Sequence, residues 1–508
     1  MKRPTPDTDE LLVQTESGVV RGTVASGVRS WRGIPYAAPP VGDRRFRAPQ
    51  RASSWQGTRD ASRFGALPMQ KRGFEVIGGA GQKTPMSEDC LTINVSAPIS
   101  KGTGLRPVIV WIYGGGFTLG GTRSALYRGD RVVTAGDVVF VSFNYRLGIF
   151  GFADFSSWSV SEHLIESNLG LRDQVAALQW VKRNIAGFGG DPDNVTIAGE
   201  SAGATSAIAL MCIPAAAGLF HRVFALSASG TVYGPQRHRL WAGALLGMLG
   251  IDPAERELVA RSLKELSAER LTAAASRFFY EIAPDAYPGL LPSSPVIDGD
   301  FLPQSPVDAF QDGSAQRLPL VIGTMSREGA ILDKALPVIC SRVNRLEAML
   351  KEADPELRTR VARAYIGYPS KRTAVDIAGD LTFWLPSVRI AEGHSRFSPC
   401  WSYRFDYATP FTRLLFREAT HGLDLPMLFG TTGEGALGRF DYFSRSASKE
   451  MSRRFQRVFL DFAHGRLPEW STYEDGARLT RIFDKEDRDE CDPRGERRLA
   501  FGSYGGPE

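Results

Sequence analysis

The sequence predicts an α/β protein with a large, mostly parallel central sheet, helices on both faces and a helical cap region. Segments with helical periodicity lie between the predicted strands; within 172–186, for example, Ala177, Leu178 and Val181 share one face. Alternation of strands and helices is typical of a parallel sheet. Continuous apolar runs, typical of strands that are covered on both faces, recur at 108–113, 138–143, 195–197, 223–226, 318–322 and 401–407.

Composition indicates a folded protein of ordinary polarity. Hydrophobic residues make up 43% of the 508 residues and charged residues 23%. The net charge of +5 is small for this length, so nucleic acid is not an expected partner. Because no Ser/Gly-rich or Pro-rich linker divides the chain, we expect a single domain over 1–508, with helical insertions around 235–306 and 342–396 that could cover a site.

Targeting signals and metal motifs do not stand out. The first ten residues carry charge, but no apolar run follows them, so we expect neither a secretory signal nor a membrane span. The five cysteines are few, odd in number and without metal-ligand spacing. We therefore expect a cytoplasmic protein with reduced thiols and with neither a metal nor a cofactor. The cysteines are Cys90, Cys212, Cys340, Cys400 and Cys491.

The ends of the chain supply three further expectations. Residues 11–15 and 19–24, separated by Glu-Ser-Gly, predict an antiparallel hairpin. Residues 31–49 are so rich in Pro and Gly that we expect a covering loop. Residues 453–463 predict a late amphipathic helix.

One serine lies where a predicted strand turns sharply into a predicted helix. The stretch 195–204 reads Val-Thr-Ile-Ala-Gly-Glu-Ser-Ala-Gly-Ala, in which glycines lie two residues either side of Ser201. Such a turn strains the serine backbone and raises its hydroxyl above the sheet edge. We therefore expect Ser201 to be a nucleophile; the alternative is a serine that caps an ordinary turn.

A serine nucleophile needs a base that takes its proton. His421 precedes Gly422 in a loop beyond the strand predicted at 401–407, and such loops present the chemistry of α/β sheets. We favour His421 as the base; the alternative is a surface loop histidine. The other five lie in helical or charged surroundings: His163, His221, His238, His394 and His464.

A third group must orient the base. Glu328 lies just past the end of a predicted strand, and the order Ser201, Glu328, His421 is that of α/β-hydrolases. Asp298 and Asp424 are competing acids. A carboxylate that interacts with a helix N-terminus is the alternative role of Glu328.

Negative charge on the attacked carbonyl oxygen requires fixed hydrogen-bond donors. Gly114, Gly115 and Gly116 follow the predicted strand 108–113, and without Cβ atoms their N–H groups can face a ligand. The N–H of Ala202, directly after the nucleophile, would complete the set. A flexible turn is the alternative reading of the three glycines.

Together these residues resemble the type-B carboxylesterase family, α/β-hydrolases that include cholinesterases and bacterial para-nitrobenzyl-type esterases. The resemblance implies that Ser201, Glu328 and His421 form a triad. It also implies that Gly115, Gly116 and Ala202 form the oxyanion hole. The matching motifs cover nearly the whole chain, at 33–37, 39–42, 87–91, 111–117, 144–148, 189–192, 199–203 and 218–222.

The chain departs from the family pattern at several positions. The family often pairs the cysteine at position 90 with an upstream cysteine, but Leu67 occupies that place, so the disulfide cannot form. No tryptophan lies between Trp55 and Trp111, where cholinesterases carry the one that stacks on quaternary ammonium, so choline esters are not expected substrates. Arg327 replaces an acidic residue before the triad glutamate, and Asp424 stands where a glutamate often follows the histidine.

The sequence thus predicts a serine carboxylesterase that hydrolyses small-molecule esters of short to medium acyl chain through an acyl-enzyme. The resemblance implies that Phe117, Ile331 and Leu332 line the substrate pocket, with core packing as the alternative. Glu200 would attract a positively charged substrate group or form buried hydrogen bonds.

Two other readings stay open. A lipase would act on longer-chain acylglycerols, and some relatives of this family are non-catalytic interaction proteins that lose the serine. Either a monomer or a homodimer is compatible with the sequence.

Overall fold

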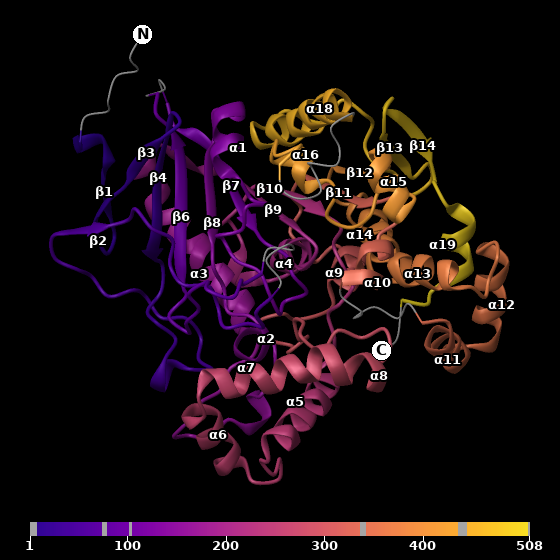
Figure 1. The fold of residues 1–508 in the computed structure, drawn as a ribbon, viewed down its shortest axis with the longest axis horizontal. Helices are drawn as coiled ribbons and strands as arrows, with labels where there is room; N and C mark the ends of the chain where they lie inside the picture. The colour runs from indigo at the N-terminus through magenta and orange to yellow at the C-terminus, as the bar shows by residue number, and fades with distance from the viewer. Residues whose placement is uncertain (1–7, 74–78, 101–103, 336–341, 435–443, 506–508) are drawn as a thin grey trace.

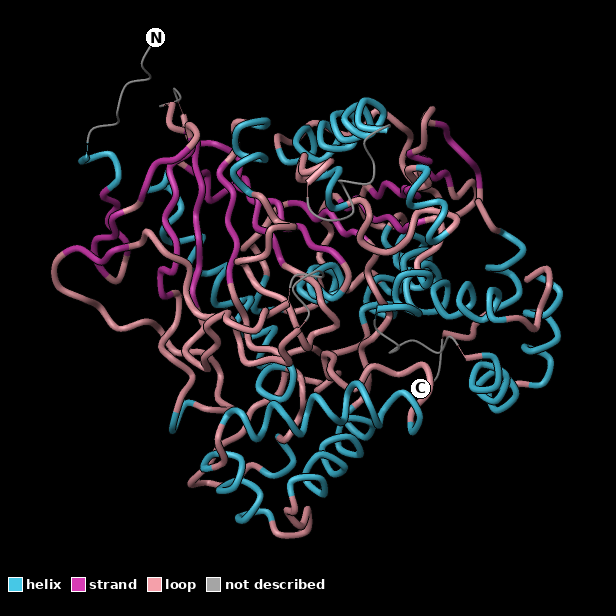
Figure 2. Tube along the Cα trace, in the orientation of Figure 1, coloured by secondary structure: helices cyan, strands magenta, loops and turns pink. Residues whose placement is uncertain are grey.

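A computed structural model describes residues 8–73, 79–100, 104–335, 342–434 and 444–505. Within these ranges an eleven-stranded mixed sheet forms the centre (Figures 1 and 2), and a three-stranded sheet of β1, β2 and β5 lies beside it. The strands are β1 Leu12–Thr15, β2 Gly18–Arg21, β3 Thr23–Ala25, β4 Val28–Pro35, β5 Thr58–Asp60, β6 Thr92–Pro98, β7 Arg106–Ile112, β8 Val139–Phe143, β9 Gly190–Glu200, β10 Arg222–Leu226, β11 Leu320–Met325, β12 Cys400–Phe405, β13 Leu479–Phe483 and β14 Arg488–Cys491.

The central sheet confirms the predicted α/β class. Its order is β14-β13-β12-β11-β10-β9-β7-β8-β6-β4-β3, and the strands from β13 through β8 run parallel. These strands are rich in Val, Ile and Phe, and β8, β10 and β11 are almost entirely buried, as strands covered on both faces are. Their carboxyl ends meet at one edge of the sheet.

Helices cover both faces of this sheet (Figure 1). Helices α1 and α18 pack on one face, where Phe455 and Phe459 of α18 contact Phe224 of β10. Helices α3 and α4 pack on the other. The helices include α1 Gly129–Gly136, α2 Gly148–Gly151, α3 Leu169–Asn184, α4 Ala202–Leu210, α9 Pro306–Asp312, α10 Gly329–Ala335, α15 Pro410–Phe416, α16 Leu425–Leu428, α18 Arg445–Ala463 and α19 Gly495–Phe501.

Two further helical groups follow the sheet strands, and the last helix of the second, α14, packs against β11 and β12. The first occupies the stretch in which an insertion was expected at 235–306 and has its own hydrophobic core; its helices are α5 Pro235–Leu249, α6 Arg256–Glu265, α7 Ala268–Arg277 and α8 Ala283–Ala286. The second falls within 342–396 and comprises α11 Val343–Ala353, α12 Pro355–Ala364, α13 Lys371–Gly379, the π-helix Asp380–Trp384 and α14 Leu385–His394. No helix in the described ranges is long and apolar enough to cross a lipid bilayer.

The N-terminal region confirms one expectation and corrects another. Strands β1 and β2 form the predicted antiparallel hairpin. The loop expected over 31–49 is wrong at its start, because Trp31 and Ile34 belong to β4 and are fully buried against β6. Gly33, with φ +70°, lies at a register shift between those two residues. The glycine therefore marks an irregularity inside a strand rather than a loop.

Candidate active site

Ser201 lies in a sharp turn between β9 and α4. Its backbone is left-handed, with φ 58° and ψ −125°, a conformation that costs energy in a non-glycine residue. Its N–H donates a 2.9 Å hydrogen bond to the Leu226 carbonyl of β10. A Cβ atom on Gly203 would lie 2.0 Å from the Ile112 carbonyl oxygen, so only glycine permits this close approach of helix and sheet.

The three glycines after β7 lie directly against Ser201. A Cβ atom on Gly114 would come within 3.0 Å of the Ser201 Cβ, and Gly115 and Gly116 have φ values of +119° and +59°. Among the described residues, the N–H groups of Gly115, Gly116 and Ala202 donate no hydrogen bond to the protein. These N–H groups are therefore free to bind an oxygen atom beside the Ser201 side chain.

Glu328 and His421 form a buried pair. His421 Nδ1 lies 2.6 Å from Glu328 Oε2, and the two residues are 9% and 2% exposed. The other carboxylate oxygen, Oε1, accepts hydrogen bonds from the Met325 N–H at 2.7 Å and the Ser227 hydroxyl at 2.8 Å. Because one oxygen is held by two donors, the second is aimed at the imidazole.

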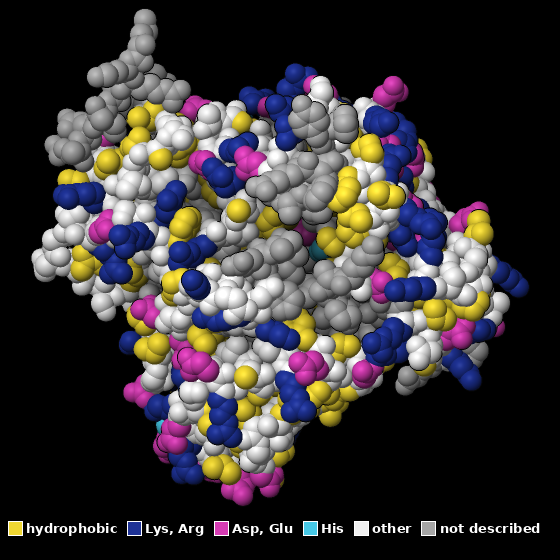
Figure 3. Space-filling model, in the orientation of Figure 1, with side chains coloured by type: hydrophobic (Ala, Val, Ile, Leu, Met, Phe, Trp, Pro, Cys, Tyr) yellow, Lys and Arg dark blue, Asp and Glu magenta, His cyan; other side chains and the backbone are white. Residues whose placement is uncertain are grey.

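The second imidazole nitrogen faces the turn that carries Ser201. His421 Nε2 lies 3.1 Å from Oε1 of Glu200, the residue that precedes the serine. Within the described residues Nε2 forms no hydrogen bond, to Ser201 Oγ or to any other group. Such hydrogen bonds are often long before substrate binds. The space-filling view shows a histidine and an acidic side chain at the bottom of a hollow bordered by hydrophobic side chains (Figure 3).

Three buried carboxyl groups determine the charge of this histidine. Burial opposes a positive imidazole, but Glu200, Glu328 and Asp424 together outweigh it and raise the pKa of His421 to about 9. Burial, followed by the charges of Glu200 and Glu328, raises the pKa of Asp424 to about 8. Burial also raises the pKa of Glu200, although His421 opposes that rise.

Of the three candidate acids, Glu328 is the one that is hydrogen-bonded to His421. Asp298 accepts hydrogen bonds from the Ser167 hydroxyl and from the Asn168 side chain, in a loop of its own. Asp424 is fully buried near His421, but the Nδ1 hydrogen bond goes to Glu328. Four other histidines contact backbone groups instead of carboxylates; these are His221, His238, His394 and His464.

The predicted pocket residues occupy two different surroundings. Ile331 and Leu332 of α10 cluster with Phe383, whose ring centroid lies 4.4 Å from that of His421. Phe117 is 1% exposed and packs on Phe152 with centroids 4.4 Å apart. Phe383 and Ser227 could not be predicted from the sequence, because no pattern distinguishes an aromatic residue in a helical stretch or a serine after a strand.

A third residue that the sequence did not point to, Arg494, holds the loop that carries Glu328. Its guanidinium donates hydrogen bonds to the Ser326 carbonyl and, at 3.1 Å, to Asp380 Oδ1. Asp380 begins the π-helix that presents Phe383 to the imidazole, and Arg497 binds its other oxygen at 2.9 Å. Arg494, which directly precedes α19, thus connects the loop that carries Glu328 with the π-helix that carries Phe383.

No group of three or more His, Cys, Asp or Glu side chains arranged to hold a metal ion occurs in the parts of the chain that the structure describes. What the site does contain is a serine on a strained turn, a histidine bonded to a carboxylate, and free N–H groups. This combination is suited to acyl transfer.

Comparison with known proteins agrees with this chemistry. A model of the carboxylesterase family matches residues 9–480. The para-nitrobenzyl esterase of Bacillus subtilis (strain 168) is 36% identical over 96% of this chain and 97% of that protein. The fumonisin B1 esterase of Sphingopyxis macrogoltabida is 32% identical over 94% of this chain and 86% of its own length.

Solved structures give the same result. A PNB esterase superposes with a TM-score of 0.83 at 36% identity, over 97% of this chain and 99% of that one. A carboxylesterase of Geobacillus stearothermophilus superposes with a TM-score of 0.82 at 34% identity, over 96% of this chain and 99% of that one.

Proposed function

The chain belongs to the carboxylesterase family and is a serine carboxylic-ester hydrolase with the α/β-hydrolase fold, and on this premise we propose that Ser201, His421 and Glu328 are its catalytic residues. The observation that carries the proposal is the 2.6 Å contact between His421 Nδ1 and Glu328 Oε2, beside the strained turn at Ser201. Ser201 is the nucleophile, His421 the general base and Glu328 the group that orients it.

Hydrolysis proceeds in two steps. His421 takes the proton of the Ser201 hydroxyl while Ser201 Oγ attacks the ester carbonyl carbon. The carbonyl oxygen thereby becomes negatively charged. The N–H groups of Gly115, Gly116 and Ala202 stabilise that charge. His421 then gives the proton to the departing alcohol oxygen. Water repeats the sequence on the acyl-enzyme and releases the acid.

The substrate is an ester of short to medium acyl chain. Ile331, Leu332 and Phe383 supply an apolar surface next to His421. Phe117 follows the glycine loop but is 1% exposed and packs on Phe152, as the alternative of core packing expects. Glu200, 3.1 Å from the imidazole, acts on the charge of His421 rather than on the substrate. The alternatives, a lipase and a non-catalytic protein, are not favoured, because relatives reported above are esterases by name.

A panel of p-nitrophenyl esters with rising acyl length tests this function. We expect kcat/KM to be highest for short to medium acyl groups and to fall by about tenfold or more for a 16-carbon chain, because the apolar surface next to His421 is small. A fluorophosphonate should label one residue, Ser201, and abolish turnover. A rate that jumps on dispersed long-chain triglyceride would favour a lipase, and an unlabelled Ser201 would reject it as the nucleophile.

Replacing Glu200 with glutamine should shift the pH profile. The base must be neutral, and the charge of Glu200 is one of the influences that raise the pKa of His421. The wild-type acid limb of kcat/KM should therefore lie above the ordinary imidazole value of 6.5. Glu200→Gln should move that limb to lower pH, by about 1 to 3 units, as measured from pH 5 to 10.

The matched control is Glu418→Gln. Glu418 lies three residues before His421, but its carboxylate is 42% exposed and pairs with Arg372. This variant should leave the acid limb in place. An unchanged limb in Glu200→Gln, or one displaced to higher pH, would contradict the electrostatic role of Glu200.

The cellular setting follows from the thiols. Cys90, Cys212, Cys400 and Cys491 are free, and Cys340 lies outside the described residues. Free thiols favour a reducing, cytoplasmic compartment. A monomer or homodimer in solution is compatible with this function, since all three proposed catalytic groups come from one chain.

A further inference from the structure

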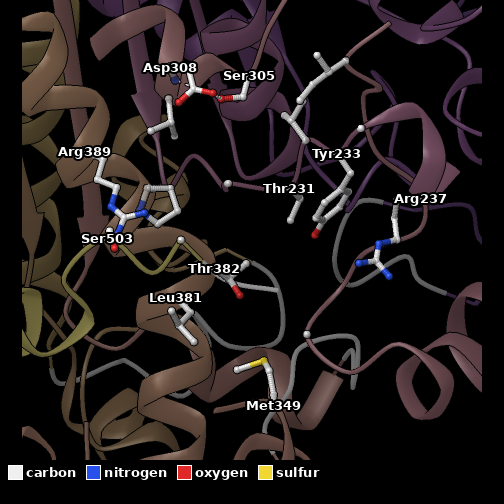
Figure 4. A pocket seen from close by; sticks show the side chains of 18 of the residues that line it. Thr231, Tyr233, Arg237, Ser305, Asp308, Met349, Leu381, Thr382, Arg389 and Ser503 are labelled. Atoms are coloured by element: carbon white, nitrogen blue, oxygen red, sulfur yellow. Dashed lines mark hydrogen bonds between the residues drawn. The ribbon is translucent and has the colours of Figure 1, made fainter. Parts of the chain in front are cut away.

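A cavity of about 750 Å³ lies between the two helical groups (Figure 4). Its walls come from the loop after β10, the start of α5, helix α9, the π-helix with the start of α14, and the chain near Ser503. Its volume falls within the range of small-molecule binding sites. Its described lining contains none of the three proposed catalytic residues, so it is a separate space.

The cavity shares two walls with the catalytic centre. Thr231 on its surface is hydrogen-bonded to Ser229 at 2.7 Å, Ser229 to Thr205 at 2.8 Å, and Thr205 to the Ser201 carbonyl at 3.1 Å. On the other side, Thr382 lines the cavity while the next residue, Phe383, contacts His421.

Two arginines give the cavity a positive charge. Figure 4 shows Arg237 and Arg389 on opposite sides, with Thr231 and Thr382 between them. Arg389 donates to the carbonyls of Gly502 and Tyr504, which are neutral. Arg237 has no hydrogen bond or ion pair with any described residue.

Nearby carboxylates compensate this charge only in part. Asp308 is the one acidic residue in the described lining, and its Oδ2 accepts a hydrogen bond from Ser305 at 2.7 Å. Glu392, one turn from Arg389 on α14, binds Arg478 at 2.7 Å. A partly buried cation without a partner is unfavourable, so an anion bound here gains a charge-assisted hydrogen bond.

Part of the remaining surface is apolar. It is formed by aliphatic and sulfur-containing side chains of five different segments, namely Val232, Ile297, Met349, Leu381 and Pro386. A ligand that matches the whole cavity therefore has an apolar body and one negative end.

We propose that this cavity is a second ligand site, which binds a small carboxylate with an apolar body, the carboxylate on Arg237 and the body over Leu381 and Met349. The carboxylic acid that ester hydrolysis releases belongs to this chemical class. The site goes beyond the proposed function, because binding at Arg237 requires no chemistry at Ser201.

The test measures binding of decanoate to the full chain by calorimetry, after a fluorophosphonate has blocked Ser201. We expect saturable binding, weakened about tenfold or more in Arg237→Gln and largely restored in Arg237→Lys. The matched control is Arg239→Gln, two residues along the same helix, whose guanidinium lies over Trp158 instead of in the cavity. It should bind like wild type. Decanol, which lacks the charge, should bind more weakly and equally in all variants.

Two results would overturn the site. One is no saturable decanoate binding to the blocked enzyme; the other is Arg237→Gln binding as tightly as Arg239→Gln, with unfolding temperatures showing that both are folded. If the fluorophosphonate fails to react, the proposed function fails instead, and the Arg237 comparison is made on Ser201→Ala.

Discussion

Ser201→Ala is expected to lower kcat by about 10⁵-fold or more, with the fold retained. The side chain is half-buried at the turn between β9 and α4, and its hydroxyl makes no hydrogen bond with any described residue. Loss of the oxygen therefore costs little stability but removes the atom that forms the acyl-enzyme. The measurement is kcat on a p-nitrophenyl ester, with the unfolding temperature taken on the same sample.

The control for this variant is Ser206→Ala on the same helix. Ser206 is fully buried and accepts a 3.0 Å hydrogen bond from Gln174, so its loss lowers stability by about 1 kcal/mol. Its activity should stay within about twofold of wild type, because it touches no group of the proposed machinery. A loss of less than tenfold in Ser201→Ala would reject Ser201 as the nucleophile.

Glu328→Gln should lower kcat by about 10⁴-fold through the tautomer of His421. The Met325 N–H and the Ser227 hydroxyl both donate to Glu328 Oε1, so the glutamine oxygen must take that position. Its NH₂ group then faces His421 Nδ1, 2.6 Å from the original oxygen, and Nδ1 has to accept. The proton is thereby placed on Nε2, and the imidazole can no longer take a proton from Ser201.

Asp424→Asn is the control for Glu328→Gln, because Asp424 is the other acid that could orient His421. Burial raises the pKa of Asp424 to about 8, so the carboxyl is mostly protonated at neutral pH, and asparagine resembles that form. We expect a loss of less than about tenfold at pH 7. Should Asp424→Asn cost more activity than Glu328→Gln, the orienting carboxylate would be Asp424.

The strands that position the site were predictable because each is a short, continuous apolar run. The runs at 108–113, 195–197 and 318–322 became β7, β9 and β11, whose ends carry the glycine loop, Ser201 and Glu328. The pairing of Glu328 with His421 depends on loops of irregular structure. From the sequence alone it could not be separated from a pairing with Asp424, which lies three residues from His421, whereas Glu328 lies 93 residues away.

Contacts of residues that belong to no motif could not be predicted from the sequence. Phe383 lies in a π-helix inside a long helical stretch, and no periodicity shows that its ring will cover His421. The strand that contains Trp31 and Ile34 is predicted as a loop, because the glycine between them interrupts the strand pattern. Hydrogen bonds between distant segments, such as Ser227 to Glu328, leave no local pattern at all.

The contacts of Arg494 with the loop that carries Glu328 form only after this late part of the chain has been synthesised. The Arg494 side chain binds the Ser326 carbonyl and Asp380, so the loop with the orienting carboxylate acquires this support from a segment far downstream of the other catalytic elements. A chain still emerging from the ribosome already contains the nucleophile, the acid and the base. It lacks the contacts of Arg494 with the Ser326 carbonyl and Asp380 until that residue has left the exit tunnel.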